Sequence, residues 1–283
     1  MLIPPRWLFN AFVVLVMVSI GLRVPHGELL GMLRDRRLLG RTLLANCVLV
    51  PALGFALAWM VPMDRAIRIG FMLLAAVPGT PAALQFTRTA RERLAFVAGL
   101  TFILSLVAVV IAPIAVEVVP HRQSEYRPVE ELILSLLLQL VVPLVAGVLL
   151  ARWWPAGAPK LVTPLNIVAT VTFVLLMWET RGLRRQAFRE MGPQPVLALF
   201  ALLVLAMAIG WWLGGPDRES RRVMATATSM RNVVVCFFVA RYWFPGTQTY
   251  LVPLAYLGMM VPVNLLFTLY QKRKERKLAA VTA

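Results

Sequence analysis

Apolar runs long enough to cross a lipid bilayer recur along almost the whole of this 283-residue chain. A helix needs about 20 mainly apolar residues to span the hydrocarbon core. Hydrophobic residues make up 60% of the chain and its mean hydropathy is +0.77, whereas soluble domains are only about 45–50% apolar. The sequence therefore predicts an all-α, polytopic membrane protein with no soluble domain of useful size.

Windows of spanning length give nine predicted helices. Most tryptophans fall near the ends of these segments, as expected for residues that anchor at the membrane interface; they are Trp59, Trp153, Trp154, Trp178, Trp211, Trp212 and Trp243. The predicted helices are Trp7–Leu22, Leu38–Trp59, Ala66–Ala90, Leu94–Val119, Glu130–Trp154, Lys160–Trp178, Pro195–Gly214, Arg221–Trp243 and Tyr250–Lys272.

The net charge of +16 is carried mostly by arginines in short connections between these segments. Such charges orient a membrane protein, because cytoplasmic loops carry the excess of Lys and Arg. Alternate connections hold most of the 29 basic residues on one side, which predicts an outside N-terminus and a cytoplasmic C-terminus in the cell membrane. The Arg181–Arg189 loop works against this orientation. No basic face with interleaved aromatic residues is present, so nucleic-acid binding is not expected.

Two predicted segments are poor continuous helices. The third contains the run Pro78-Gly79-Thr80-Pro81 and then the polar Gln85, Thr87 and Thr89. Two prolines and a glycine within four residues remove backbone donors and break a helix. The eighth has no proline, but its middle is polar. Interrupted, polar segments in corresponding positions of two halves point to the substrate site of a transporter. A proline kink with a polar seam between packed helices is the alternative.

Arg231 lies near the middle of the eighth segment, with Thr228, Ser229 and Asn232 around it. A guanidinium at membrane depth costs about 2.5–3.5 kcal/mol on insertion scales, so it needs a partner or a purpose. One interpretation is an anchor for a carboxylate or sulfonate, which a guanidinium binds in bidentate fashion. The other is a structural tie to carbonyls freed by the Pro78–Pro81 break. Arg41, one turn into its segment, is expected to reach the interface.

The 13 acidic residues all fall in loops, tails or segment ends. Proton coupling through a membrane carboxylate is therefore disfavoured. The same absence, with no Ser/His/Asp set or zinc-protease motif, argues against an enzyme, so no catalytic residues are expected. His26 and His121 have no cysteine or carboxylate cluster around them, which gives no support for a metal site. Cys47 and Cys236 lie in apolar segments and are interpreted as small hydrophobic residues.

Four groups of residues follow one another along the chain: Val18-Ser19-Ile20-Gly21-Leu22, Asn46 followed by Val50-Pro51, Gly70-Phe71-Met72-Leu73-Leu74 leading to Pro78-Gly79, and Arg222 with Met230-Arg231-Asn232. Together they resemble the bile acid:sodium symporter family. The resemblance implies a nine-helix form, lacking the first helix of a ten-helix fold, in two inverted repeats at 1–128 and 129–283. It also implies a panel of segments 1, 5 and 6, and a core of the other six in which segments 3 and 8 cross at their breaks.

The resemblance carries over only part of the family's ion sites. Asn46 stands where sodium-coupled members have a glutamine, and Thr101 stands on a hydroxyl position. The glutamate that binds both sodium ions is replaced by Ala227, and the glutamine before Asn232 by Arg231. The family's Ser-Asn pair becomes Ala83-Leu84, and a serine becomes Val97. Hard cations need several oxygen ligands, and a charged one helps most, so sodium is not favoured as a cofactor here.

The expected function is secondary transport of a small or amphipathic organic anion by alternating access, with altered or absent sodium coupling. Predicted substrate-binding residues are Arg231, Asn232, Ser229, Thr228, Thr80 and Gln85, with Asn46 and Thr101 as weaker ion-binding candidates. Alternatives are a sodium:organic anion symporter, an exporter of a neutral or oxyanionic solute, and a transport-dead membrane receptor. The partners expected are the anion and the lipid bilayer, and the panel's apolar face leaves a homodimer open.

Overall fold

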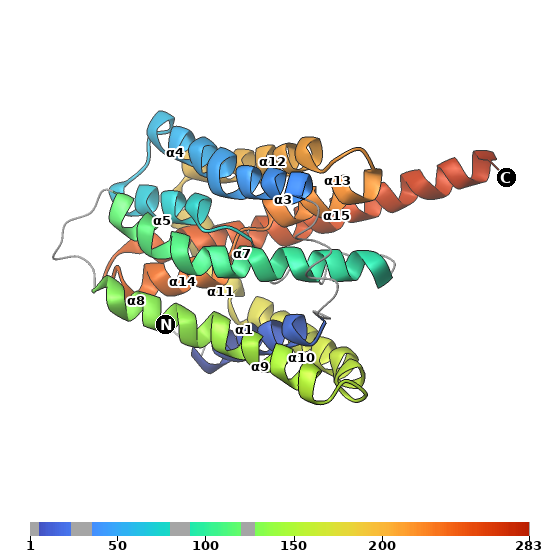
Figure 1. Cartoon of the computed structure of the whole chain (residues 1–283). Helices are drawn as coiled ribbons and strands as arrows, with labels where there is room; N and C mark the ends of the chain where they lie inside the picture. Colours follow the sequence, from blue (N-terminus) through green and yellow to red (C-terminus); the bar gives the residue numbers. More distant parts are fainter. Residues whose placement is uncertain (1–5, 24–35, 80–90, 120–127, 283) are drawn as a thin grey trace.

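The computed structural model describes residues 6–23, 36–79, 91–119 and 128–282 (Figure 1). Their regular secondary structure is helical, and no strand occurs in these ranges, which confirms the all-α prediction. Seven helical stretches in them are long and apolar enough to cross a membrane, and Trp7–Arg23 is a shorter apolar helix. The seven are Arg36–Met60, Gly99–Val118, Glu130–Trp153, Ala158–Glu179, Pro193–Leu213, Arg218–Tyr242 and Gln248–Gln271.

The described helices follow the order of the nine predicted segments. The first four segments contain α1 (Arg6–Arg23), then α3 (Arg36–Leu43), η1 (Leu44–Leu49) and α4 (Val50–Met60), then α5 (Arg65–Ala76), then α7 (Arg91–Val118). The next two contain α8 (Val129–Leu136), η3 (Leu137–Val141) and α9 (Val142–Trp153), then α10 (Ala158–Glu179) and the short α11 (Arg181–Met191). The last three contain α12 (Pro193–Leu213), then α13 (Arg218–Ser229) and α14 (Val233–Tyr242), then η4 (Gln248–Tyr250) and α15 (Leu251–Thr282).

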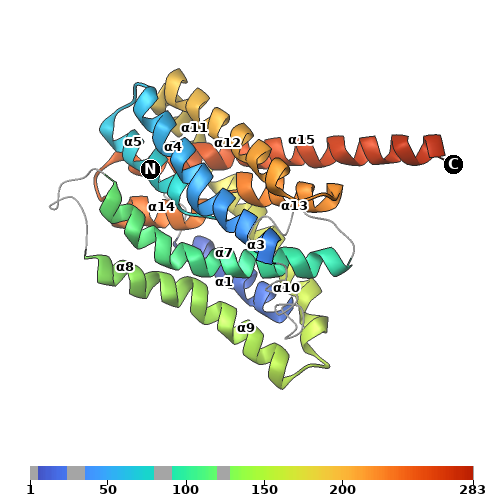
Figure 2. The same ribbon diagram turned by 45° about the horizontal axis from the view of Figure 1, so that its top comes forward.

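The helices form two groups, seen below and above in Figures 1 and 2. In the panel group, α1 packs against α9 and α10. Gly21 and Gly147 permit this packing: a Cβ on Gly21 would lie 2.3 Å from the Leu144 carbonyl oxygen, and one on Gly147 would lie 2.4 Å from that of Val18. Small residues let membrane helices approach this closely. The panel group therefore holds together through direct backbone contact.

The core group contains the remaining long helices. Within it, α12 packs against α13, α4 against α5, and α15 against α5 and α14, while α7 contacts both groups. This division matches the expected panel of segments 1, 5 and 6 and the expected core. The relation of the two halves as inverted repeats, with a boundary after residue 128, stays a prediction. At its C-terminal end α15 extends well beyond the other helices (Figure 1).

Both predicted helix breaks are present. α5 ends at Ala76, and Val77, Pro78 and Gly79 continue as buried, non-helical chain. Gly79 has φ +64°, and an added Cβ would lie 2.7 Å from the Cβ of Leu104, so both conformation and space favour glycine there. The eighth segment separates into α13 and α14 between Ser229 and Val233. The middle of each broken segment is therefore free to present backbone groups to its surroundings.

Two sequence-based expectations are wrong. The Arg181–Arg189 stretch was expected to be a loop, but it is part of α11, whose buried face is Leu183, Ala187 and Met191 at a four-residue spacing. Because α11 contains four arginines, its composition is polar overall, and this hides the spacing of its apolar residues. Trp243 was expected at the membrane interface, but it is 3% exposed and its indole Nε1 donates to the Pro128 carbonyl at 3.2 Å. A polar partner inside the protein replaces the headgroup region for this indole.

Candidate functional site

Arg231 is fully buried at the break between α13 and α14, and its guanidinium donates only to groups of the core group among the described residues. Nε donates to the Leu74 carbonyl at 3.3 Å, and Nη2 donates to the carbonyls of Ala75 at 2.5 Å and Asn46 at 3.4 Å. Nη1 donates to Oδ1 of Asn46 at 3.2 Å. Four of its five N–H groups are thus matched to oxygen atoms.

Two prolines explain why these three carbonyls accept from a side chain. The helical partner of Leu74 O would be the nitrogen of Pro78, which carries no hydrogen. The partner of Ala75 O would be Gly79, which lies beyond the end of α5. In η1 the Val50 N–H reaches back to Ala45 O, and the next nitrogen, that of Pro51, cannot donate to Asn46 O. Arg231 replaces the missing donors.

Asn46 connects the second segment to the eighth through its side chain. Its Nδ2 donates to the Thr42 carbonyl at 3.1 Å and to Thr228 Oγ1 at 3.4 Å, while its Oδ1 accepts from Arg231. Both ends of the amide are therefore used, and the residue is buried. Asn46 holds the second segment against the last turn of α13 and against Arg231. The predicted candidates Asn46, Thr228 and Arg231 are thus brought together in one hydrogen-bonded cluster.

Ser229 ends α13 and is held by α15. Tyr256 Oη donates to the Ser229 carbonyl at 2.6 Å, and Ser229 Oγ lies 3.1 Å from both Asn264 Oδ1 and the Thr226 carbonyl. Neither Tyr256 nor Asn264 was among the predicted site residues. Each is a buried polar residue within an apolar segment, which is the same signal that identified the eighth segment.

Asn232 has one side-chain group in use and one unused. Its Oδ1 caps α14 by accepting from the Val235 N–H at 3.2 Å. Its Nδ2 is buried without a hydrogen-bond partner among the described residues. The N-terminus of α14 carries the positive end of the helix dipole at the same place. An unused amide donor and a helix N-terminus together favour a negatively charged or acceptor group at this position.

The surroundings of Ala227 are apolar. Ala227 packs with Leu100 and Leu104 of α7 and with Val223 and Met224 of its own helix. Thr101, the other ion-binding candidate, is buried next to Leu100 in sequence. In the described ranges no group of three or more His, Cys, Asp or Glu residues gathers in a way that could hold a metal ion. The cation that the described part of the break contains is the guanidinium of Arg231.

The order of segments, the two breaks and the two helix groups agree with one known family. A family model described as the sodium bile acid symporter family matches residues 11–184. The chain belongs to this family. It is therefore a multi-pass membrane protein of a transporter family, which agrees with the expectation that it is not an enzyme.

Two relatives of this family member extend the likeness along the chain. The rice (Oryza sativa subsp. japonica) protein named probable sodium/metabolite cotransporter BASS2, chloroplastic, is 22% identical over 242 residues, which cover 84% of this chain and 57% of the rice protein. The Bacillus subtilis (strain 168) protein named uncharacterized sodium-dependent transporter YocS is 23% identical over 230 residues, which cover 78% and 70% of the two chains. The chain thus spans a little over half the length of the rice protein.

Three residues of the predicted site, Thr80, Pro81 and Gln85, are outside the described residues. Arg41 is exposed on α3, in agreement with a side chain that reaches the membrane interface. The candidate site of this symporter-family protein therefore consists of the hydrogen-bonded cluster around Arg231 and of Asn232 at the N-terminus of α14.

Proposed function

We propose that this protein transports a small organic anion by alternating access, and that Arg231 replaces the sodium ion on which other members of the family are built. The observation that carries the proposal is the oxygen shell around the guanidinium. Three carbonyls and one amide oxygen are ligands of the kind that a hard cation selects. Here the guanidinium of Arg231, a cation that is part of the chain, donates hydrogen bonds to these four oxygens.

The replaced carboxylate supports the same conclusion. The family's glutamate position is Ala227, which lies in an apolar cluster. A sodium site without a charged ligand is weak, and a guanidinium beside it repels a second cation. The positive charge of Arg231 is permanent at physiological pH. We therefore infer that anion binding in this protein needs no sodium.

The anion itself is proposed to bind at Asn232. The unused Nδ2 of Asn232 and the N-terminus of α14 supply hydrogen-bond donors and positive potential. Arg231 then acts on the anion through its charge, since its described hydrogen bonds go to the protein. Its remaining N–H and the predicted residues Thr228 and Ser229 complete the polar surroundings. A monoanion, such as a carboxylate, suits a site with a single buried cation.

The core group would move against the panel group during transport, carrying the crossing from one side of the membrane to the other. The excess of basic connections supports an orientation with the N-terminus outside and the C-terminus in the cytoplasm. The left end of the bundle in Figure 1, where α1, α5 and α8 begin, is then the external end. The cell membrane is the proposed location.

Thermal unfolding of the purified protein in sodium or potassium buffer, with a series of organic carboxylates and sulfonates, tests the proposal. A ligand of the native state raises its stability by RT ln(1 + [L]/Kd). We expect one or more anions to stabilise the protein equally in both buffers. The double variant Ala227→Glu/Arg231→Gln, which restores the family's carboxylate and removes the fixed cation, should respond to the anion only in sodium. Arg41→Gln is the matched control, because Arg41 is exposed and distant in sequence from both breaks.

Sodium-coupled symport is the second candidate, favoured by the printed names of both relatives, which mention sodium. It predicts stabilisation of the unmodified protein by sodium alone, and no anion response in potassium. That result would exclude Arg231 as a substitute cation. An anion that binds without being transported would instead indicate a receptor.

A further inference from the structure

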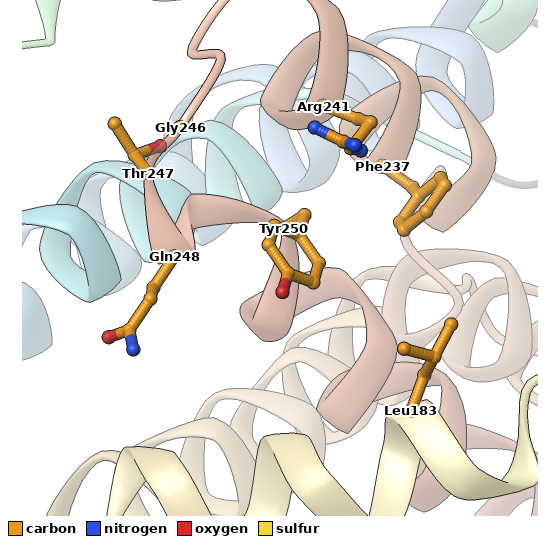
Figure 3. Close-up of a pocket in the computed structure, with 7 residues that line it drawn as sticks. All are labelled: Leu183, Phe237, Arg241, Gly246, Thr247, Gln248 and Tyr250. Atoms are coloured by element: carbon orange, nitrogen blue, oxygen red, sulfur yellow. The ribbon is translucent and has the colours of Figure 1, made fainter. Parts of the chain in front are cut away.

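A cavity lies between α11, the end of α14 and the turn that leads into α15. The end of α14 is at the left end of the bundle in Figure 1. The volume of the cavity is about 310 Å³, within the range of pockets that hold small organic ligands. Figure 3 shows its walls. They come from α11, from the end of α14 and from the turn that leads into α15, and include Leu183, Phe237, Arg241, Thr247, Gln248 and Tyr250.

The chemistry of the cavity combines one cation with an aromatic corner. The guanidinium carbon of Arg241 lies 5.9 Å from the ring centroid of Tyr250. The rings of Phe237 and Tyr250 meet edge to face, with centroids 6.5 Å apart and an interplanar angle of 90°. In the described part of the chain no carboxylate pairs with Arg241. The cavity thus offers a guanidinium with no carboxylate partner among the described residues, next to two aromatic rings.

This pairing of groups selects a particular ligand class. A guanidinium binds carboxylates and sulfonates through two parallel hydrogen bonds. The parts of the Phe237 and Tyr250 rings that line the cavity can contact a flat apolar body. An aromatic or polycyclic monoanion satisfies both at once. A simple inorganic anion would bind the guanidinium but would leave the two aromatic rings in contact with water.

The position of the cavity relates it to the candidate site. Arg241 follows Asn232 by nine residues along α14, which is about 13 Å of helix. Between them, Phe237 stacks flat on Phe9 of α1, with centroids 4.8 Å apart and planes 9° from parallel. Phe9 belongs to the panel group and Phe237 to the core group. Their stack therefore joins the two groups beside the cavity, at the level between it and the helix break.

We propose that this cavity captures aromatic or polycyclic organic monoanions before they reach the crossing, with Arg241 binding the anionic head and the Phe9–Phe237 stack closing the path beneath. Transport of the captured anion rests on the proposed function, but the residues that bind it in the cavity are not those of the site at the helix break. An anion held at Arg241 lies against Phe237, so opening of the stack would pass it along α14 towards Asn232.

Binding of 2-naphthoate to the purified protein, measured by isothermal titration calorimetry, tests the site. Neutral 2-naphthalenemethanol and the cationic 2-naphthyltrimethylammonium ion serve as ligands of similar shape. We expect 2-naphthoate to bind, Arg241→Gln to weaken binding at least tenfold, and Arg241→Lys to recover part of it. Arg185→Gln is the matched control, since Arg185 is an exposed arginine of α11. It should bind as the unmodified protein does.

A crossing variant, Asn232→Ala, separates this proposal from the proposed function. We expect it to retain 2-naphthoate binding in the cavity while losing uptake into proteoliposomes. Arg241→Gln should raise the KM for uptake and leave the saturating rate within about twofold. If Arg241→Gln binds and transports 2-naphthoate normally while Asn232→Ala does neither, the capture site is wrong and the proposed function stands. If no anion binds to any form, both are wrong.

Discussion

Asn46 Oδ1 and Arg231 Nη1 lie 3.2 Å apart in the buried centre of the core group, where a side chain of the second segment meets the break of the eighth. The same amide donates to Thr228 and to the backbone of its own helix. One neutral residue therefore orients the buried cation without cancelling its charge. This distinction between holding and neutralising the guanidinium underlies the first prediction.

Asn46→Asp should weaken anion binding, with some loss of stability because the Thr42 carbonyl loses its Nδ2 donor. The carboxylate would still accept from Arg231, while neutralising the charge that acts on the anion. We expect an affinity about tenfold lower, which corresponds to roughly 1.4 kcal/mol. The affinity for a stabilising anion is measured from the thermal shift that the anion produces. Asn166→Asp, a change in the panel group where Asn166 Oδ1 accepts from Ser19, should leave affinity unchanged. Equal affinities in both variants would mean that the charge of Arg231 does not reach the ligand.

Arg231→Gln should destabilise the protein markedly. A glutamine amide can satisfy at most two of the oxygens that Arg231 now serves, so buried carbonyls of Leu74, Ala75 or Asn46 lose their donor. Hydrogen bonds from charged groups contribute about 1.5–3 kcal/mol each, so Tm should fall by roughly 5–10 °C. A melting curve without ligand provides the measurement. An unchanged Tm would contradict the structural role of the guanidinium.

Gly79→Ala should cost more than an ordinary glycine replacement. It introduces a side chain at φ +64° and places a Cβ 2.7 Å from that of Leu104. Gly192→Ala isolates the first effect, because Gly192 also has positive φ, at +75°, with open space around it. We expect a loss of about 1 kcal/mol at Gly192 and at least 2 kcal/mol at Gly79. Similar melting temperatures for the two variants would show that Leu104 of α7 can move away from the added Cβ without loss of stability.

Tyr256→Phe removes the hydroxyl that donates to the Ser229 carbonyl at 2.6 Å. The carbonyl stays buried at the end of α13, so a loss of about 1–3 kcal/mol in stability is expected. Tyr270→Phe is the control, because Tyr270 is 62% exposed. Both proteins can be compared by unfolding in the same detergent. Tyr256→Phe should also slow uptake, since the end of α13 would no longer be fixed to α15. A variant that melts and transports normally would contradict this role.

The sequence predicted the helices and both breaks for reasons that are local. Two prolines and a glycine within residues 78–81 end a helix, whereas a single proline such as Pro113 lies inside one. Arg231 is conspicuous in any apolar segment. The partners of Arg231 are not local, since the three carbonyls belong to residues more than 150 positions away along the chain. The carbonyl of Asn46 becomes available only because the chain forms a π-helix before Pro51.

The missed residues follow the same division. Tyr256 and Asn264 are polar residues in an apolar segment, a signal that the sequence analysis did not use, and only the folded structure shows that both contact Ser229. The aromatic pair Phe9 and Phe237 carries no signal in a chain this rich in apolar residues. α11 was missed because four arginines conceal a three-residue apolar face. Chemistry that depends on one residue type is readable from sequence, and chemistry that depends on juxtaposition is not.

In the proposed mechanism, the attachment of Arg231 to the chain would also limit the energy that is available for transport. A sodium ion that enters and leaves in each cycle transfers the energy of its own gradient to the solute. A guanidinium that travels back and forth with the core group returns to its starting point and contributes nothing over a full cycle. A carrier of this kind only equilibrates its anion. At 100 mV, inside negative, one charge is worth about 2.3 kcal/mol, roughly a 50-fold ratio, so net uptake of a monoanion through the external cavity would require an outside concentration more than about 50-fold above the inside one.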